Sequence, residues 1–95
     1  MSNILKELRK EIDIVDRELV SVLARRFKIT HKVGVYKAQF DVPSFDKKRE
    51  SEILENKKLL AKKYNINPLL VEKIFKLVMA ETRKNHRYEK NGNSK

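Results

Sequence analysis

The sequence predicts an all-α fold with three helices per chain, one of them very long, that form an intertwined homodimeric helical bundle. Apolar residues in the first 37 positions alternate at spacings of three and four, which is typical of one face of a long amphipathic helix. Only two glycines and two prolines are present, and this scarcity favours a few long helices over many short strands. A first helix of ~36 residues would be ~54 Å long, against ~30 Å for helices of ~20 residues. Since one copy would leave much of the long apolar face in water, we expect a second copy to cover it.

The first helix is expected to begin near Ser2 or Asn3, either of which suits an N-cap, and to run through Lys37 or a few residues beyond. Gly34 lies inside the apolar pattern. Because the pattern continues past it, we expect the helix to be continuous there, although a mid-helix glycine costs ~1 kcal/mol relative to alanine. The apolar stripe, called the N-terminal seam below, consists of Leu5, Leu8, Ile12, Val15, Leu19, Val22, Ile29, Val33 and Tyr36.

One position of the N-terminal seam is basic: Arg26 stands where an apolar residue is expected. A cation on an apolar stripe lowers stability unless it meets an anion there. Lys37 follows about three helical turns later at nearly the same azimuth, and Arg9 also lies beside the seam. We therefore interpret the first helix as a scaffold that directs cations into the interior of the bundle.

The second helix is expected to follow the break at Pro43, because proline disfavours helical geometry at the residue before it. Ser44 is the predicted N-cap, with Asp46 in the first turn, where a carboxylate suits the helix dipole. The helix is predicted to run to about Tyr64, with an apolar face formed by Ile53, Leu60 and Tyr64.

The third helix has a strong start signal, Asn67 as the cap and Pro68 at the first helical position. Its predicted apolar face consists of Val71, Ile74, Phe75, Val78 and Met79. We expect residues 1–88 to form one helical domain and the polar residues 89–95 to form a flexible tail.

The composition of the chain limits the kinds of partner, chemistry and cellular location that we expect. The net charge of +10 favours an anionic partner, either a small anionic substrate or a nucleic acid. No cysteine is present, which excludes disulfides and thiolate chemistry, and the two histidines are too far apart to suggest a metal site. No apolar run approaches the ~20 residues that span a bilayer, and the N-terminus has no signal-peptide pattern. We expect a cytoplasmic protein with no membrane contact.

Each predicted helix carries polar residues where its apolar stripe should continue. Taken one helix at a time, each group has an ordinary explanation. The arginine of the first helix could extend its charged end to water, the polar residues of the second could belong to a solvated helix start, and those of the third could lie on the surface of a fraying chain end. Taken together, they would form one cation-rich pocket with two carboxylates and two hydrogen-bonding groups. The residues concerned are Arg26 and Lys37, then Asp46, Arg49 and Glu50, and then Thr82 and His86.

Such a pocket suits a particular chemistry. Arginines bind carboxylates through paired, planar hydrogen bonds, so several of them indicate a substrate with more than one carboxylate or phosphate. A buried lysine stabilises negative charge that develops on an oxygen. No Ser-His-Asp set, glycine-rich phosphate loop or metal cluster is recognisable. The pattern therefore predicts a site that works by positioning and electrostatics, without covalent chemistry.

Five stretches carry a resemblance to a known family: LRKEID around Arg9, VLARRF around Arg26, VGVYK ending at Lys37, DKKRE from Asp46 to Glu50, and LVMAET ending at Thr82. On these stretches, which lie in order within residues 4 to 87, the chain resembles the all-helical (AroQ-type) chorismate mutases. The mutase domain of bifunctional chorismate mutase/prephenate dehydrogenase is the most similar kind. The resemblance implies the pericyclic (Claisen) rearrangement of chorismate to prephenate in aromatic amino-acid biosynthesis, catalysed without a cofactor.

The resemblance also implies roles for the basic residues of the first helix. Arg26 and Lys37 match the family's substrate-binding arginine and lysine. Arg9 matches an arginine that crosses from the partner subunit to hold a substrate carboxylate. A homodimer in which Arg9 acts in trans is therefore expected.

In the other two helices, Asp46 and Glu50 match acidic positions near the ring hydroxyl of the substrate, with Arg49 supporting the carboxylate and the acidic pair. Thr82 stands where the family often has serine. His86 departs from the family, which carries glutamine or glutamate near the ether oxygen. Because a protonated histidine is the stronger hydrogen-bond donor, we expect activity that changes with pH in the range where histidine titrates.

Three alternatives stay open. An isochorismate-pyruvate lyase has the same fold and a similar pocket, although the VGVYK and LVMAET stretches favour the mutase. A basic helical nucleic-acid-binding protein would fit the net charge, but it would concentrate its cations on one surface, and many here are spread over outer faces, such as Lys57, Lys58, Lys62 and Lys63. The last alternative is a dimerisation module without catalysis.

Overall fold

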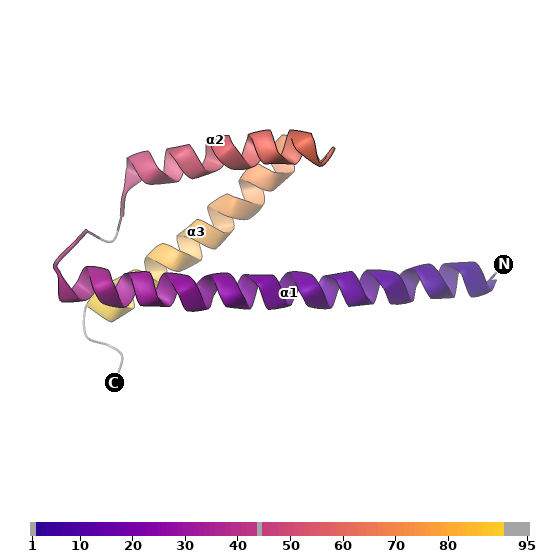
Figure 1. Ribbon diagram of the computed structural model, residues 1–95, viewed down its shortest axis with the longest axis horizontal. Helices are drawn as coiled ribbons and strands as arrows, with labels where there is room; N and C mark the ends of the chain where they lie inside the picture. The colour runs from indigo at the N-terminus through magenta and orange to yellow at the C-terminus, as the bar shows by residue number, and fades with distance from the viewer. Residues whose placement is uncertain (1, 44, 91–95) are drawn as a thin grey trace. The chain divides into compact units, whose positions relative to one another are not determined.

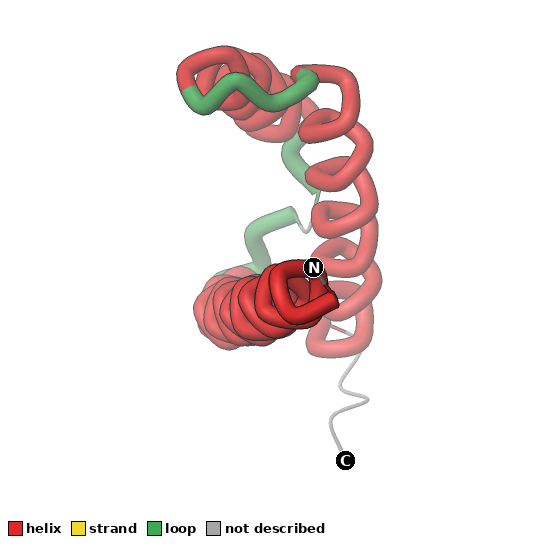
Figure 2. The backbone as a smooth tube through the Cα atoms, turned by 90° about the vertical axis from the view of Figure 1, so that its right-hand side faces the viewer, coloured by secondary structure: helices red, strands yellow, loops and turns green. Residues whose placement is uncertain are grey.

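The computed structural model describes residues 2–43 and 45–90, and within these residues it contains three α-helices and no strand (Figure 2). The helices are α1 (Ser2–Gln39), α2 (Lys47–Lys63) and α3 (Pro68–Lys90). The predicted all-α class is confirmed. None of these helices is long and apolar enough to cross a membrane.

The chain divides into two compact units, residues 1–30 and residues 31–95. The first unit consists of the greater part of α1, and the second contains the last turns of α1 together with α2 and α3. As predicted, α1 continues through Gly34, which is buried, and ends two residues after Lys37.

Both α1 and α2 end at a residue in the left-handed region, which turns the chain and satisfies the last carbonyls of the helix. After α1 this residue is Asp41, with φ of 54°, and the N–H of Val42 donates to the carbonyl of Lys37 at 2.8 Å. After α2 it is Asn65, with φ of 59°. Aspartate and asparagine tolerate this region better than most residues. The sequence showed the two breaks but not this means of ending the helices.

The start of α2 corrects one prediction. Asp46 is the N-cap itself, not a first-turn residue, and its Oδ1 accepts a hydrogen bond from the backbone N–H of Arg49 at 3.0 Å. This bond satisfies one of the four amide groups that a helix start leaves without an intrahelical partner, so the helix begins at Lys47. Ser44, the predicted cap, lies outside the described residues.

The start of α3 confirms its prediction. The side chain of Asn67 accepts a hydrogen bond from the backbone N–H of Leu69 at 3.0 Å, and Pro68 is the first helical residue. At its other end α3 continues through Lys90, so residues 89 and 90 of the expected tail are helical. Residues 91–95 lie outside the described part of the chain.

The second unit is held together by α2 packing against α3. The buried apolar residues at its core are Ala61, Val78 and Met79, which expose 3%, 9% and 4% of their surfaces. In Figure 1 the two helices meet at the loop 64–67 and separate toward the start of α2. Most of the predicted face of α3 is confirmed, but Ile74 is exposed.

The predicted packing face of α2 is wrong in two of its three members. Ile53 is half-buried, but Leu60 and Tyr64 are exposed. The face toward α3 passes instead through Leu54 and Ala61, seven residues apart and therefore on one side of the helix. Alanine lets two helices approach closely, yet it contributes little to a hydrophobic pattern, so the pattern pointed to the larger apolar residues.

Two further contacts join these helices. The ammonium group of Lys58 lies 3.2 Å from Glu55 on its own helix and 3.4 Å from Glu72 on α3. The Lys57 ammonium group lies 5.9 Å from the centroid of the Phe75 ring. Polar residues therefore contribute to a helix pair whose apolar core is small.

Candidate active site

The residues predicted for the site are divided between the two units. Arg9 and Arg26 belong to the first unit. The other six belong to the second unit and come from the end of α1, the start of α2 and the C-terminal half of α3: Lys37, Asp46, Arg49, Glu50, Thr82 and His86.

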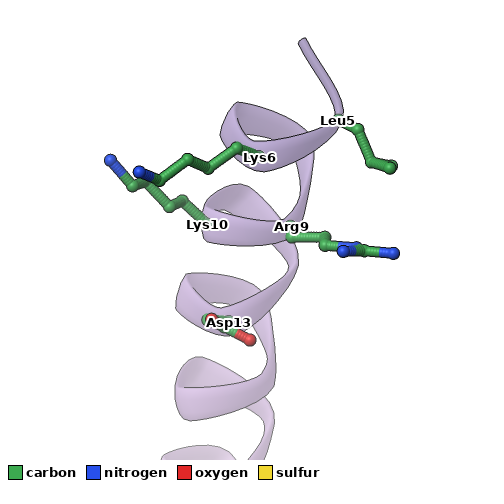
Figure 3. A pocket seen from close by; sticks show the side chains of 5 residues that line it. All are labelled: Leu5, Lys6, Arg9, Lys10 and Asp13. Carbon is green, nitrogen blue, oxygen red and sulfur yellow. The ribbon is translucent and has the colours of Figure 1, made fainter. Parts of the chain in front are cut away.

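Arg9 lies on the exposed N-terminal half of α1 and lines a surface hollow of about 470 Å³. Figure 3 shows its side chain extending to the same side of the helix as Leu5, while Lys6 and Lys10 extend to the other side. The guanidinium group therefore projects beside an apolar residue of the N-terminal seam. Such a position suits contact with a surface that covers the seam.

Arg26 lies on the least exposed face of the first unit. Residues 3–22 are exposed throughout, whereas Leu23, Arg26, Phe27 and Thr30 are half-buried and recur at the spacing of one helical face. The Thr30 hydroxyl donates a hydrogen bond to the Phe27 carbonyl at 3.2 Å, so it is satisfied within the helix. Arg26 is thus partly withdrawn from water, together with residues that are not members of the N-terminal seam.

Lys37 lies in the last turn of α1 and is half-buried. A cation is favourable there because the carbonyl groups at a helix C-terminus carry partial negative charge. The neighbouring rings of Tyr36 and Phe40 contact each other, with centroids 4.6 Å apart. The turn that presents the ammonium group is therefore anchored by an aromatic pair and by the hydrogen bond from Val42 to the carbonyl of Lys37.

The start of α2 places two carboxylates in different settings. Asp46 is exposed and caps the helix, whereas Glu50 is half-buried and accepts a hydrogen bond from the guanidinium group of Arg83 on α3. The guanidinium carbon of Arg83 also lies 5.2 Å from the centroid of the Phe45 ring, within the range of a cation–π contact. Arg49, predicted to support the acidic pair, has an exposed side chain.

Arg83, the partner of Glu50, is a residue that the sequence reasoning missed. It pairs with a residue 33 positions away, and no periodic pattern reports such a contact. The one available signal was its place between Thr82 and His86, at the point where the apolar stripe of α3 becomes polar.

The polar end of the α3 stripe is withdrawn from solvent. Thr82 is half-buried, and its hydroxyl donates to the carbonyl of Val78 at 3.0 Å. His86, one helical turn later on the same face, exposes 6% of its surface. His86 therefore belongs to the buried face of α3 and not to a solvated chain end.

The second unit thus contains a carboxylate paired with a guanidinium group between the start of α2 and α3, and a hydroxyl and a buried imidazole in the C-terminal half of α3. The lysine at the end of α1 belongs to the same unit. Among the described residues, no group of three or more histidine, aspartate or glutamate side chains is placed to hold a metal ion.

Comparison with known proteins identifies the family. The sequence profile of the family described as chorismate mutase type II matches residues 8–87. The chain belongs to this family. All eight predicted site residues lie inside the matched range, with Arg9 and His86 close to its two limits.

Individual relatives agree with this membership of the type II chorismate mutases. The chain is 37% identical over 78 residues to the T-protein of Haemophilus influenzae, covering 82% of this chain and 21% of that protein. It is 31% identical over 75 residues to the chorismate mutase of Methanocaldococcus jannaschii, covering 79% of this chain and 76% of that protein. It is 43% identical over 51 residues to the bifunctional chorismate mutase/prephenate dehydratase of Aquifex aeolicus, covering 54% of this chain and 14% of that protein. The chain spans about a fifth of the length of the T-protein, and most of the length of the Methanocaldococcus protein.

Proposed function

We propose that the chain is a chorismate mutase, an isomerase that converts chorismate to prephenate in aromatic amino-acid biosynthesis. The observation that carries the proposal is the family match over residues 8–87, which contains all eight residues of the predicted site. The Methanocaldococcus relative, 76% of which is covered by this chain, is itself named a chorismate mutase. A domain of this size is therefore a reasonable unit for the reaction.

The reaction explains why the proposed site needs cations more than acids and bases. Chorismate rearranges through a chair-like transition state in which an ether bond breaks while a carbon–carbon bond forms. No proton is transferred. The protein has to hold the enolpyruvyl arm over the ring, and Arg26, with Arg9 of a second copy, would do so by binding the two substrate carboxylates. Positioning of this kind lowers the barrier by removing the freedom of the flexible substrate.

Charge stabilisation is the second requirement. Negative charge grows on the ether oxygen as the bond breaks, and Lys37 and His86 are proposed to donate hydrogen bonds to it. Asp46 and Glu50 are proposed to lie near the ring hydroxyl. Arg49 and Thr82 complete the proposed binding set.

A homodimer is part of this proposal. The apolar residues of the N-terminal seam are all exposed in the chain, with exposed fractions between 41% for Val33 and 60% for Val15. Covering such a stripe with the same stripe of a second copy would bury it and would bring Arg9 of one copy to the other copy's substrate. The proposed enzyme acts in the cytoplasm, uses chorismate as its substrate and needs no cofactor.

The test is a direct assay of the purified chain with chorismate, following the loss of its ultraviolet absorbance and identifying the product. We expect prephenate, and we expect Arg26→Ala to abolish most of the activity. Arg25→Ala is the matched control, because it removes the exposed arginine that directly precedes Arg26. Absence of turnover in the wild-type chain would overturn the proposal. Isochorismate, with detection of pyruvate, would then be the next substrate to assay.

A further inference from the structure

Arg83 contacts one residue that precedes α2 and one residue in the first turn of α2. Its guanidinium group contacts the Phe45 ring, which precedes the cap residue Asp46, and donates to the carboxylate of Glu50 in the first turn of the helix. The side chains of Arg83 and Glu50 expose 30% and 21% of their surfaces, so water screens this pair less than it screens an exposed surface pair.

The contact of Arg83 differs from the other contacts between α2 and α3 in its position along the two helices. Lys58 meets Glu72, and Lys57 meets Phe75, near the end at which α2 and α3 are connected. The contact of Arg83 lies toward the other end, where the two helices separate in Figure 1. A long side chain is required to span that separation, and arginine supplies both length and a planar group that stacks on a ring while it donates hydrogen bonds.

We propose that Arg83 is a positioning residue that fixes the start of α2, and with it Asp46 and Glu50, against the face of α3 that carries Thr82 and His86. The inference rests on the proposed function for the roles of these four residues. Arg83 itself acts through Glu50 and the Phe45 ring and has no contact with the substrate. Its loss would let the first turn of α2 move, so that the groups nearest the ring hydroxyl lose their alignment with those nearest the ether oxygen.

The first experiment measures the position of α2 without any use of activity. Amide hydrogen exchange is recorded by NMR on the full chain for the wild type, Arg83→Gln and Arg83→Lys. We expect exchange at residues 50–54 to become about tenfold faster in both variants, while residues 58–62 keep their protection. Lys84→Gln, which removes the exposed neighbouring charge, is the control and should match the wild type.

The second experiment uses steady-state kinetics with chorismate. Arg83→Gln is expected to lower kcat/KM between about tenfold and a hundredfold, through KM more than through kcat, because a displaced group weakens binding in ground and transition states alike. Glu50→Gln is expected to have a large effect in the wild-type background and little further effect when Arg83 is already glutamine, because the two residues act as a unit.

The outcomes separate this inference from the proposed function. If the wild-type chain does not turn over chorismate, the exchange data still decide whether Arg83 holds the start of α2. Exchange and kinetics of Arg83→Gln that match those of Lys84→Gln would overturn the inference, and so would equal losses from Glu50→Gln in both backgrounds. If Arg83→Gln fails to fold, Arg83→Lys carries the same test, because it keeps the charge but cannot stack and donate in the same way.

Discussion

Lys37 is the single residue on which the proposed charge stabilisation depends most. It is half-buried at the end of α1, and a fixed cation stabilises an oxygen whose negative charge develops only in the transition state. Lys37→Ala is therefore expected to lower kcat about a hundredfold or more, with a smaller rise in KM. Steady-state kinetics measure both constants, and Lys32→Ala, which removes an exposed lysine of the same helix, is the control. An unchanged kcat would contradict the role.

His86 stands where the resemblance to the family implies glutamine or glutamate. It exposes 6% of its surface and lies one helical turn after Thr82 on the same face of α3. We expect the pH dependence of kcat/KM to differ between the wild type and His86→Gln, because an imidazole is an ionisable hydrogen-bond donor and an amide is not. His86→Ala should have a kcat/KM lower than that of the wild type by about tenfold or more.

The pH profile of kcat/KM is the measurement for His86. His31→Gln is the control, because it removes an exposed histidine of α1 and should leave the profile unchanged. A profile that is the same in the wild type and in His86→Gln, together with full activity of the alanine variant, would remove His86 from the site.

At the scale of the helix, Asp46 combines a structural role that the structure shows with a binding role that is proposed. As the N-cap of α2 it accepts the Arg49 amide hydrogen bond. Asp46→Ala should lower the free energy of unfolding by about 1 kcal/mol, whereas Asp46→Asn should preserve it, because asparagine caps a helix as well as aspartate. Urea denaturation measures these differences. If Asp46→Asn is stable but impaired with chorismate, the carboxylate has a role beyond capping; full activity would limit Asp46 to the cap.

The pairing of α2 with α3 should depend on pH in the alkaline range. Hydrogen bonds to Glu55 and then Glu72 raise the pKa of Lys58 above its ordinary value of 10.5. Because the folded-state pKa is the higher one, the pair contributes fully to stability below the unfolded-state pKa and loses its contribution as the pH rises through the folded-state pKa. Replacing Glu72 should therefore lower the stability of the fold at neutral pH and have no effect on its stability in strong alkali.

Melting temperatures of Glu72→Gln and of the wild type, recorded from pH 7 to about pH 11.5, test this expectation. The variant should melt a few degrees lower at neutral pH, and the two curves should converge as the pH rises beyond the ordinary pKa of lysine. Glu52→Gln, which removes an exposed carboxylate of α2, should follow the wild type at every pH. A difference that grows with rising pH would contradict the assignment.

At the scale of the whole molecule, the proposed dimer makes a quantitative prediction. If Arg9 acts in trans, Arg9→Ala and Arg26→Ala are each nearly inactive alone, but a mixed dimer contains one complete site. Refolding the two variants together in equal amounts should restore about a quarter of wild-type activity, since half of the dimers are mixed and half of their sites are complete. The same mixture of Arg9→Ala with Arg9→Ala,Arg26→Ala is the control and should stay inactive. Absence of recovery, with a dimer present by sedimentation, would show that Arg9 acts within its own chain.

Part of the fold followed directly from the sequence. The two breaks, the start of α3 at Pro68 and the continuity of α1 through Gly34 were predicted correctly, because caps, prolines and apolar periodicity act over a few residues. The start of α2 was placed too early, since Ser44 and Asp46 are both good caps and nothing local distinguishes them.

The packing face of α2 was beyond the reach of the same reasoning. This helix is highly polar, and its most buried residue is Ala61, whose small side chain gives hardly any hydrophobic signal. The larger apolar residues Leu60 and Tyr64 misled the prediction. Which face of such a helix packs depends on how closely its neighbour approaches, and a single helix does not encode that distance.

By itself, the sequence determined that the chain is helical, where two of the three helices begin, and that polar residues interrupt each apolar stripe. These properties depend on helical periodicity and on hydrogen bonds between residues a few positions apart. Only the tertiary structure decided that Ala61 faces α3, that His86 is buried, and that Glu50 pairs with Arg83. These features depend on the rotation of each helix about its axis and on contacts across 33 residues, which are fixed only when the helices pack.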